Sequence, residues 1–290
     1  RMMDLGLLGM ADPVTRYLPW FTPKAPDGSM PTITIRHLLT HTSGITYDVP
    51  LTISRGAGGP IISLEENLRR LGELPLAFLP GTAWRYGMSI DVLGGVLAAI
   101  NGSDVEAALQ RYVTGPLGMT DTTFRLHAPD RLAVPYGDGK PTPFRLPEPH
   151  WVENNNSREP FSPARAFEPD APQCGGGGML GTAGDFMKLL EALKGDFLKP
   201  QTREAAFGNQ VGDLPRDEGG QRWGLFCAII ADPAAAGYGT PAGTIHWGGS
   251  WGNNWVLDRI SGRSIVVFTN TMFEGCNGPF RDELREAAYA

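Results

Sequence analysis

The sequence predicts an α+β protein, an α/β sandwich in which an antiparallel sheet is flanked by helices and joined to a mainly helical region. Two observations predict this class. Apolar residues recur at helical spacing up to about residue 195, and from about residue 223 they give way to short runs of β-branched and aromatic residues separated by turn-forming residues. We therefore expect residues 1–195 to be mainly helical and rich in loops, and residues 196–290 to hold the sheet and a C-terminal helix, both within one domain.

The helical pattern occurs in six segments: 34–40, 64–71, 89–100, 103–113, 182–193 and 281–289. Two of them begin with a capping spacing, in which a Ser or Thr is followed three residues later by an acidic residue. These pairs are Ser103 with Glu106 and Thr182 with Asp185. The last helix is expected to pack on one face of the sheet.

Strands are expected at 223–231, 243–247, 255–260 and 263–269, where β-branched and aromatic residues gather. The link from Ile260 to Arg263 contains Ser261 and Gly262 and predicts a tight hairpin, so the sheet should be an antiparallel meander. Residues 130–172 are rich in proline and predict a long irregular insertion.

Charge and composition argue against several classes of protein. The 290 residues carry 25 Lys and Arg against 31 Asp and Glu, a net charge of −6 without a basic stripe, so no nucleic-acid partner is expected. No apolar run approaches the roughly 18 residues of a membrane-spanning helix, so no membrane association is expected. The three cysteines (Cys174, Cys227 and Cys276) lie far apart without a Cys-x-x-Cys pair, which favours free thiols and a cytoplasmic location.

Three short motifs lack the context that their chemistry needs. Residues 248–252 match Gly-x-Ser-x-Gly, but a nucleophile elbow requires a helix directly after the serine, and here the sequence continues as a strand. His37 and His41 have the spacing of zinc ligands, but Leu38 stands where a metalloprotease has Glu and no third ligand is apparent, so a structural role and no metal are expected. The glycine run 175–178 lacks the rest of a phosphate-binding loop, and we expect a close-approach or mobile loop there.

Several separated segments, taken together and in order, resemble one known family. They are PTITIRHLLTHTSGI at 31–45, PGTAWRY at 80–86, DVLG at 91–94, PLGM at 116–119, GGMLGTAGD at 177–185 and HWGGS at 246–250. The set resembles the serine hydrolases related to class C β-lactamases, DD-peptidases and family VIII carboxylesterases, and it covers nearly the whole chain. The resemblance implies a β-lactamase/transpeptidase-like fold and acyl transfer through a serine acyl-enzyme.

The same resemblance implies roles for individual residues. Tyr86 would be the general base in acylation and the proton donor to the leaving group. The strand at Trp247, Gly248 and Gly249 would lie against the acyl group, and the backbone N–H of Ser250 would serve as an oxyanion donor beside that of the nucleophile. A nucleophile, a base and oxyanion donors suffice for acyl transfer, so no metal or other cofactor is expected.

Two departures from the family pattern point to the substrate. Lactamases keep a lysine at the position of Trp247 and an amide side chain at the position of Met88. Both changes remove polar anchors and add apolar surface. We therefore expect Trp247 and Met88 to contact a small-molecule carboxylic ester, with β-lactam turnover weak or absent.

The most serious departure is the nucleophile. In the family, a Ser-x-x-Lys motif supplies the serine and a lysine that shares the proton work with the tyrosine. Only five lysines occur in this sequence, and none has a serine three residues before it. Because the motif precedes the segment at 31–45 in the family, we expect the nucleophile just upstream of residue 1, and the 290-residue chain alone to be an inactive, incomplete catalytic domain.

Two other functions remain open at this point. One is a non-catalytic homologue that keeps the site as a binding or scaffold surface, in which case the upstream sequence also lacks Ser-x-x-Lys. The other is an active β-lactamase or DD-peptidase of the same fold. Reading the upstream sequence distinguishes the non-catalytic homologue from the esterase. A chromogenic cephalosporin assay beside an ester assay distinguishes the β-lactamase from the esterase.

Overall fold

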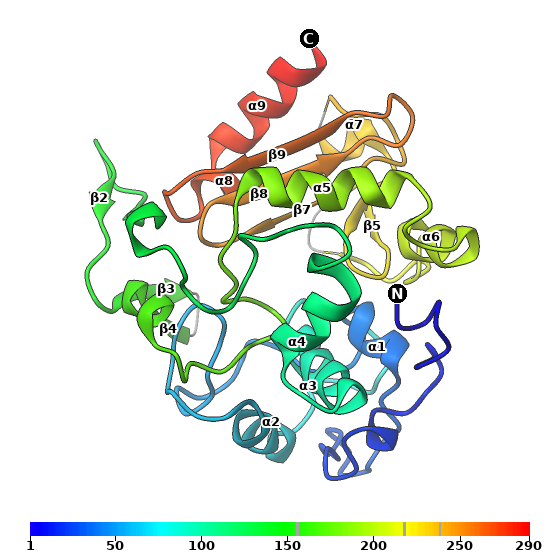
Figure 1. Cartoon of the computed structure of the whole chain (residues 1–290). Coiled ribbons are helices and arrows are strands. Elements are labelled where there is room, and N and C mark those ends of the chain that lie inside the picture. Colours follow the sequence, from blue (N-terminus) through cyan, green and yellow to red (C-terminus); the bar gives the residue numbers. More distant parts are fainter. Residues whose placement is uncertain (155–156, 217–218, 238) are drawn as a thin grey trace.

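The computed structural model describes residues 1–290 except 155–156, 217–218 and 238. Its main sheet has five antiparallel strands in the order of the chain (Figure 1). They are β5 (Gln221–Trp223), β6 (Ala228–Ile230), β7 (Ile245–Gly249), β8 (Asn253–Leu257) and β9 (Ser264–Phe268). The predicted antiparallel meander is therefore confirmed. A hairpin joins β8 and β9 as expected, but Asp258 N donates to the carbonyl of Arg263 at 2.8 Å, so its loop spans 259–262 and is longer than the tight turn expected at 260–263.

Helices cover both faces of this sheet. On one face α5 (Ala183–Lys194) and α6 (Pro200–Phe207) close an apolar core with β7, β8 and β9, to which Leu190, Leu193 and Leu257 belong. On the other face lie α8 (Glu274–Asn277) and α9 (Pro279–Tyr289), and a guanidinium nitrogen of Arg285 lies 3.0 Å from Nδ1 of His246. The expected division at residue 195 places α5 with the helical region, whereas the structure packs α5 against β9 of the sheet.

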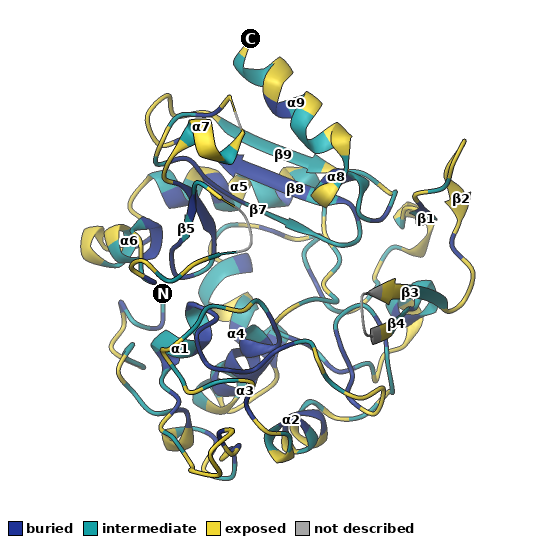
Figure 2. Ribbon diagram, turned by 180° about the vertical axis from the view of Figure 1, so that it is seen from behind, coloured by how far each residue is buried: buried dark blue, intermediate teal, exposed yellow. Residues whose placement is uncertain are grey.

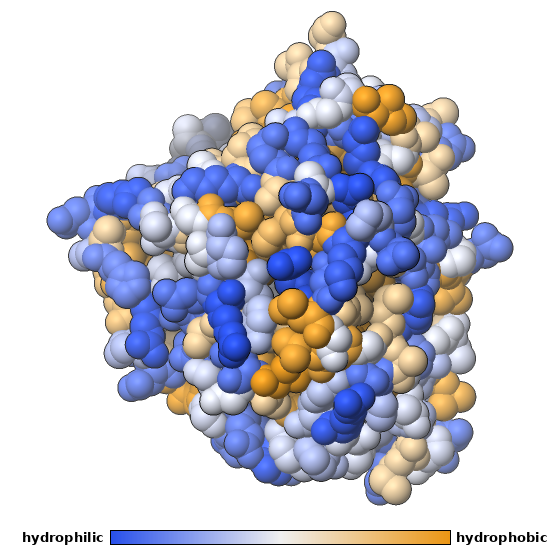
Figure 3. All heavy atoms as spheres, turned by 45° about the vertical axis from the view of Figure 1, so that its right-hand side comes forward, coloured by the Kyte–Doolittle hydropathy of each residue, from blue (hydrophilic) through white to orange (hydrophobic). Residues whose placement is uncertain are grey.

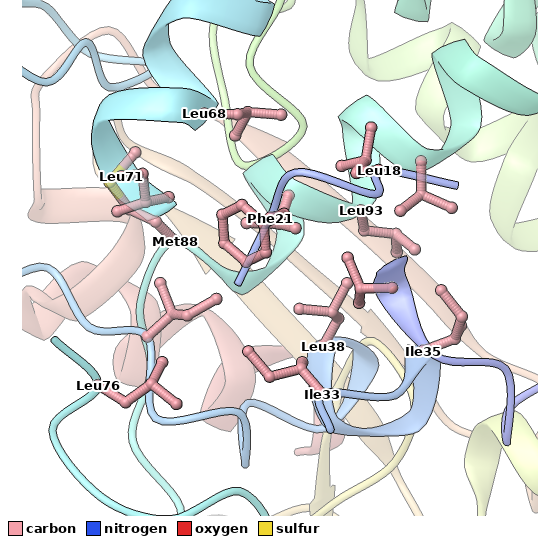
Figure 4. Packing of buried hydrophobic residues seen from close by; sticks show 14 of the residues in the cluster. Leu18, Phe21, Ile33, Ile35, Leu38, Leu68, Leu71, Leu76, Met88 and Leu93 are labelled. Atoms are coloured by element: carbon pink, nitrogen blue, oxygen red, sulfur yellow. The ribbon is translucent and has the colours of Figure 1, made fainter. Parts of the chain in front are cut away.

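The helical region lies beneath the sheet in Figure 1 and has its own core (Figure 4). It comprises α1 (Ile35–Leu39), α2 (Leu64–Glu73), α3 (Ser89–Asn101) and α4 (Val105–Leu109), with one π-helical turn at Gln110–Thr114. Ile35, Leu38, Leu68 and Val92 are fully buried between these helices. Figure 2 shows the same concentration of buried residues in α3 and in β8. The sequence predicted Ser103 as the N-cap of α4. In the structure the next residue, Asp104, is the N-cap, and its carboxylate accepts a hydrogen bond from Ala107 N at 2.8 Å.

The irregular connections differ from the expectation in three places. The strand expected at 223–231 is divided into β5 and β6, because the chain turns between them and Gly224 N donates to the carbonyl of Cys227. The insertion at 130–172 contains two hairpins: β1 (Tyr136–Gly137) with β2 (Phe144–Arg145), and β3 (His150–Asn154) with β4 (Ser157–Phe161). Helix α6 and the short α7 (Pro233–Ala236) were not expected. Short 3-10 turns occupy Val14–Arg16, Pro129–Arg131 and Pro163–Phe167.

Surface and interior are divided in the manner of a folded α+β domain. The face drawn in Figure 3 is largely hydrophilic and shows apolar residues in limited patches. Within the described residues, no single helix has the length and apolar composition of a membrane span, although α3 and Val105–Thr114 meet that criterion as a bent pair. An apolar cavity of about 150 Å³ lies beside α1, α3 and α4, lined by Leu39, Leu97 and Tyr112 among others.

Candidate active site

The loop that carries Tyr86 is fastened to the end of α1. Arg85 N donates to the carbonyl of His41 at 3.0 Å, and Gly87 N donates to Nδ1 of His41 at 3.3 Å. At Gly87 a side chain would not fit, because a Cβ atom would lie 2.5 Å from the carbonyl oxygen of Ile45. Tyr86 is thus held from both sides by backbone contacts, which fix the direction of its side chain.

His41 supports this loop as a neutral ring. It follows α1 with a φ of 54°, and its side chain is buried. Burial, assisted by the charge of Arg216, lowers the pKa of His41 to about 3, so Nδ1 can accept the hydrogen bond from Gly87 at neutral pH. The ring centroid of His41 lies 4.3 Å from that of Tyr86. His37 instead accepts a hydrogen bond from Thr34 N in a capping box, so the two histidines serve different structural contacts.

Tyr86 meets Trp247 across a distance of 161 residues in the sequence. Nε1 of Trp247 donates to the Tyr86 hydroxyl at 3.3 Å, and their ring centroids lie 5.0 Å apart. Trp223, which is fully buried, packs edge-on against Trp247 at 4.7 Å. Its own Nε1 donates to the carbonyl of Leu39 at 3.1 Å, which ties β5 to the end of α1. The candidate site is therefore built where the sheet and the helical region meet.

The environment keeps the Tyr86 hydroxyl protonated at neutral pH. Burial raises the pKa of Tyr86, and the hydrogen bond from Trp247 opposes the rise. The carboxylate of Asp91, in the first turn of α3, raises the pKa of Tyr86 further. Asp91 is itself buried, and burial raises its pKa to about 6. Tyr86 therefore needs a nearby cation before it can act as a base.

The glycine run at 175–178 passes directly over α3 at this point. Gly176 N donates to the Asp91 carboxylate at 3.4 Å. A Cβ atom at Gly176 would lie 2.6 Å from Oδ2 of Asp91, and one at Gly175 would lie 2.1 Å from the carbonyl oxygen of Ile90. Of the two expectations for this run, the close approach is confirmed.

The second predicted segment continues from Trp247 along β7. Gly248 pairs with Asn254 and Gly249 with Asn253, and the chain then turns at Ser250 into β8. The Gly-x-Ser-x-Gly match is thus part of a β-hairpin, and no helix follows the serine. The carbonyl of Ser250 accepts a hydrogen bond from Phe273 N at 2.9 Å, which anchors this end of the strand. The oxyanion role of the Ser250 N–H stays a prediction.

Met88 packs in a different apolar cluster from Tyr86 and Trp247. Its side chain is fully buried in the core of the helical region, so it presents no surface to a substrate. The expected substrate contact at Met88 is therefore not found. Its apolar character is explained by its packing in this core.

Sequence reasoning missed several members of the aromatic cluster. Tyr47 is one of them, and its ring centroid lies 5.7 Å from that of Tyr86. Burial raises the pKa of Tyr47 well above its ordinary value. Trp84 and Trp223 are two others, with ring centroids 5.6 Å apart. Trp84 lies in the PGTAWRY segment and Tyr47 lies two residues after PTITIRHLLTHTSGI, so their positions in the sequence were the only available signal.

Comparison with known sequences gives a consistent result. The profile of the family described as Beta-lactamase matches residues 1–290. Esterase EstB of Burkholderia gladioli is 42% identical over 305 aligned residues, which cover 100% of this chain and 78% of that protein. Monacolin J acid methylbutanoyltransferase of Aspergillus terreus is 34% identical over 183 residues, which cover 60% of this chain and 42% of that protein.

Solved structures agree with these matches. EstCE1, described as a hydrolase with promiscuous acyltransferase activity, has a TM-score of 0.95 and 35% identity, and the match covers 100% of this chain and 80% of that chain. A penicillin-binding protein from Bacillus halodurans has a TM-score of 0.69 at 20% identity, covers 100% and 81% of the two chains, and supports the fold alone. The expected β-lactamase/transpeptidase-like fold is confirmed by these matches.

Proposed function

The chain belongs to the β-lactamase family and is a hydrolase related to esterases, and from this premise we propose that it cleaves small carboxylic esters through a serine acyl-enzyme. The observation that carries the proposal is the contact between the Tyr86 hydroxyl and Nε1 of Trp247 at 3.3 Å, at the point where β7 meets the helical region. An indole in this place offers stacking and apolar contact, which suits an uncharged ester group.

In the proposed reaction a serine oxygen bonds to the ester carbonyl carbon while its proton passes to Tyr86. The bond to the alcohol oxygen then breaks, and the alcohol leaves with the proton from Tyr86. Water attacks the acyl-enzyme in the same way, which releases the acid and restores the serine. Because burial raises the pKa of Tyr86, the proposal needs the lysine that the family resemblance implies, since a neighbouring cation favours the ionised tyrosine.

The position of the nucleophile stays a prediction, and the proposal depends on it. The 290 residues contain no Ser-x-x-Lys motif. The test compares this chain with the product of the complete open reading frame of its gene, with p-nitrophenyl butyrate as the substrate. Ester turnover by that product, but not by this chain, supports the proposal. A complete reading frame without Ser-x-x-Lys and without turnover supports a non-catalytic homologue.

The same assay ranks the related activities. With Trp247 in place of a lysine, we expect a chromogenic cephalosporin to be turned over at least about 100-fold more slowly than the ester, a difference of roughly 3 kcal/mol in transition-state stabilisation. Faster turnover of the cephalosporin would favour a β-lactamase. Adding a primary alcohol tests acyl transfer, which the similarity to EstCE1 favours as a second activity, because a new ester then forms at the expense of free acid.

Ser250 is proposed to act through its backbone N–H. We expect Ser250→Ala to keep kcat/KM within about threefold, because alanine retains the N–H, whereas loss of an oxyanion donor costs roughly 3 kcal/mol. The measurement is kcat/KM of the product of the complete open reading frame, called the ester-active chain below, with thermal unfolding as a check on folding. A loss of about 100-fold or more in a folded variant would mean that the hydroxyl itself takes part.

A further inference from the structure

A cation lies beside the candidate active site in a place that no sequence motif marks. The guanidinium carbon of Arg216 lies 4.6 Å from the ring centroid of Trp84, 5.1 Å from that of Trp223 and 5.9 Å from that of Trp247. Ring faces attract a guanidinium at such distances. Arg216 therefore belongs to the same aromatic cluster as Tyr86.

The guanidinium is held in place by the edge of the sheet. Nη1 of Arg216 donates to Oε1 of Gln221 at 3.2 Å and to the carbonyl of Arg222 at 3.0 Å. Gln221 is buried in β5, so its side chain is a fixed acceptor. Arg216 itself is half-buried, and the backbone contact to β5 fixes its distance from the rings.

The charge of Arg216 affects the groups of the candidate site. It contributes to the lowered pKa of His41, whose ring lies against Tyr86 at 4.3 Å. Trp247 touches both groups, since its Nε1 bonds to the Tyr86 hydroxyl and its ring faces Arg216. The Tyr86 hydroxyl and the cation are therefore contacts of the same indole, and a ligand with a short methylene chain is the kind expected to reach both.

A second observation points to an acceptor at this place. Among the described residues, Nε1 of Trp84 is buried without a hydrogen-bond partner, and the ring that carries it faces Arg216 at 4.6 Å. A buried N–H donor without an acceptor is unfavourable. A carboxylate would supply both an acceptor for an indole N–H and the negative charge that a guanidinium binds.

We propose that Arg216 and Trp84 bind a carboxylate carried by the ester substrate, remote from the bond that is cleaved. This inference rests on the proposed function and names its substrate class as half-esters of short dicarboxylic acids, or esters with an equivalent anionic group. It also revises the interpretation of Trp247. The positive charge that lactamases keep at position 247 is supplied here by Arg216, which precedes β5 in the chain.

The test is a binding measurement that requires no turnover. Glutaric acid monoanilide and valeranilide match in length, and they differ in that the first ends in a carboxylate and the second in a methyl group. Both are amides that replace the labile ester. Tryptophan fluorescence or calorimetry of the 290-residue chain gives the two dissociation constants. We expect the carboxylate ligand to bind about tenfold more tightly, as for one charge-assisted contact, and the preference to shrink as salt is raised from about 0.01 to 0.5 M.

Variants test whether Arg216 causes the preference for the carboxylate ligand. Arg216→Gln is expected to bring the two affinities within about twofold, and Arg216→Lys to keep about a third of the preference because it retains the charge without the planar fork. The matched control is Arg85→Gln, which removes the same charge from an exposed side chain 4.0 Å from Asp48 and should leave the preference unchanged. Circular dichroism verifies folding, and Arg216→Lys decides the outcome where Arg216→Gln does not fold.

Three results would overturn the inference: equal affinities for the two ligands in the unaltered chain, a preference that does not respond to salt, or a preference that survives in folded Arg216→Gln. Failure of the proposed esterase function gives a different result from failure of this inference. An ester-active chain that binds both anilides equally retains the esterase function and loses this inference. A chain that prefers the carboxylate but whose complete reading frame never cleaves an ester retains the anion site and loses the esterase function.

Discussion

Replacement of Tyr86 by phenylalanine is expected to lower kcat/KM for p-nitrophenyl butyrate by about 10²–10⁴-fold in the ester-active chain, the usual contribution of a positioned acid and base. The change removes one oxygen atom and leaves the ring, which lies 4.3 Å from His41 and 5.0 Å from Trp247. The lost hydrogen bond from Trp247 costs about 1 kcal/mol of stability. The activity loss should therefore occur in a folded protein.

The kinetic parameters separate a chemical role from a binding role. If Tyr86 transfers the proton, kcat should fall and KM should change little. Tyr112→Phe is the matched control, since Tyr112 lines the apolar cavity beside α4 and lies apart from the aromatic cluster. Activity of Tyr86→Phe within about threefold of the parent would remove Tyr86 from the mechanism.

Acid is expected to destabilise the chain strongly through His41. Its pKa in the folded chain is about 3, whereas an ordinary histidine has a pKa near 6.5. As the pH falls through 6.5, His41 becomes protonated in the unfolded chain but stays neutral in the folded chain. Stability is therefore lost from about pH 6.5 down to about pH 3. The full loss is about 5 kcal/mol, with a slope approaching 1.4 kcal/mol per pH unit.

The measurement is urea unfolding of the 290-residue chain at intervals between pH 7 and pH 4. Asparagine at position 41 does not titrate, so the stability of His41→Asn should fall with acid less steeply than that of the parent. Other buried groups, His246 among them, remain in both proteins and cancel in the difference. Replacement of the exposed His127 by asparagine is the control for the loss of an imidazole at the surface. Parallel curves for parent and His41→Asn would contradict the assignment.

Local patterns in the sequence predicted the parts of the fold that local contacts determine. The spacing of Thr182 and Asp185 predicted the start of α5, and Thr182 Oγ1 does accept from Asp185 N at 3.2 Å. The hairpin between β8 and β9 follows from turn chemistry in the same way. The hairpins β1 to β4 escaped prediction, because their strands are short, β4 contains Pro160, and contacts with distant residues hold them. One such contact is the ion pair between Arg55 and Glu159.

The candidate site was predictable only where the family resemblance marked it. Tyr86 and Trp247 were named from their segments, and the structure places them in contact. Periodicity and spacing along the sequence do not predict a contact between residues that are so far apart in the chain. Arg216 escaped prediction because its significance lies in three rings that come from separate parts of the chain. Met88 follows the candidate residue Tyr86 by two positions and yet is buried in the core, because neighbours along the chain can face opposite ways.

The central claim is that esters are cleaved through a serine acyl-enzyme with Tyr86 as the proton carrier. Intact-protein mass spectrometry after rapid mixing with p-nitrophenyl butyrate tests it most directly, with the product of the complete reading frame, its Tyr86→Phe variant and the 290-residue chain compared side by side. We predict one butyryl group on the serine of a Ser-x-x-Lys motif in the first, much slower acylation in the second and none in the third. Ester hydrolysis without a serine adduct, or acylation at an unchanged rate in Tyr86→Phe, would contradict the claim.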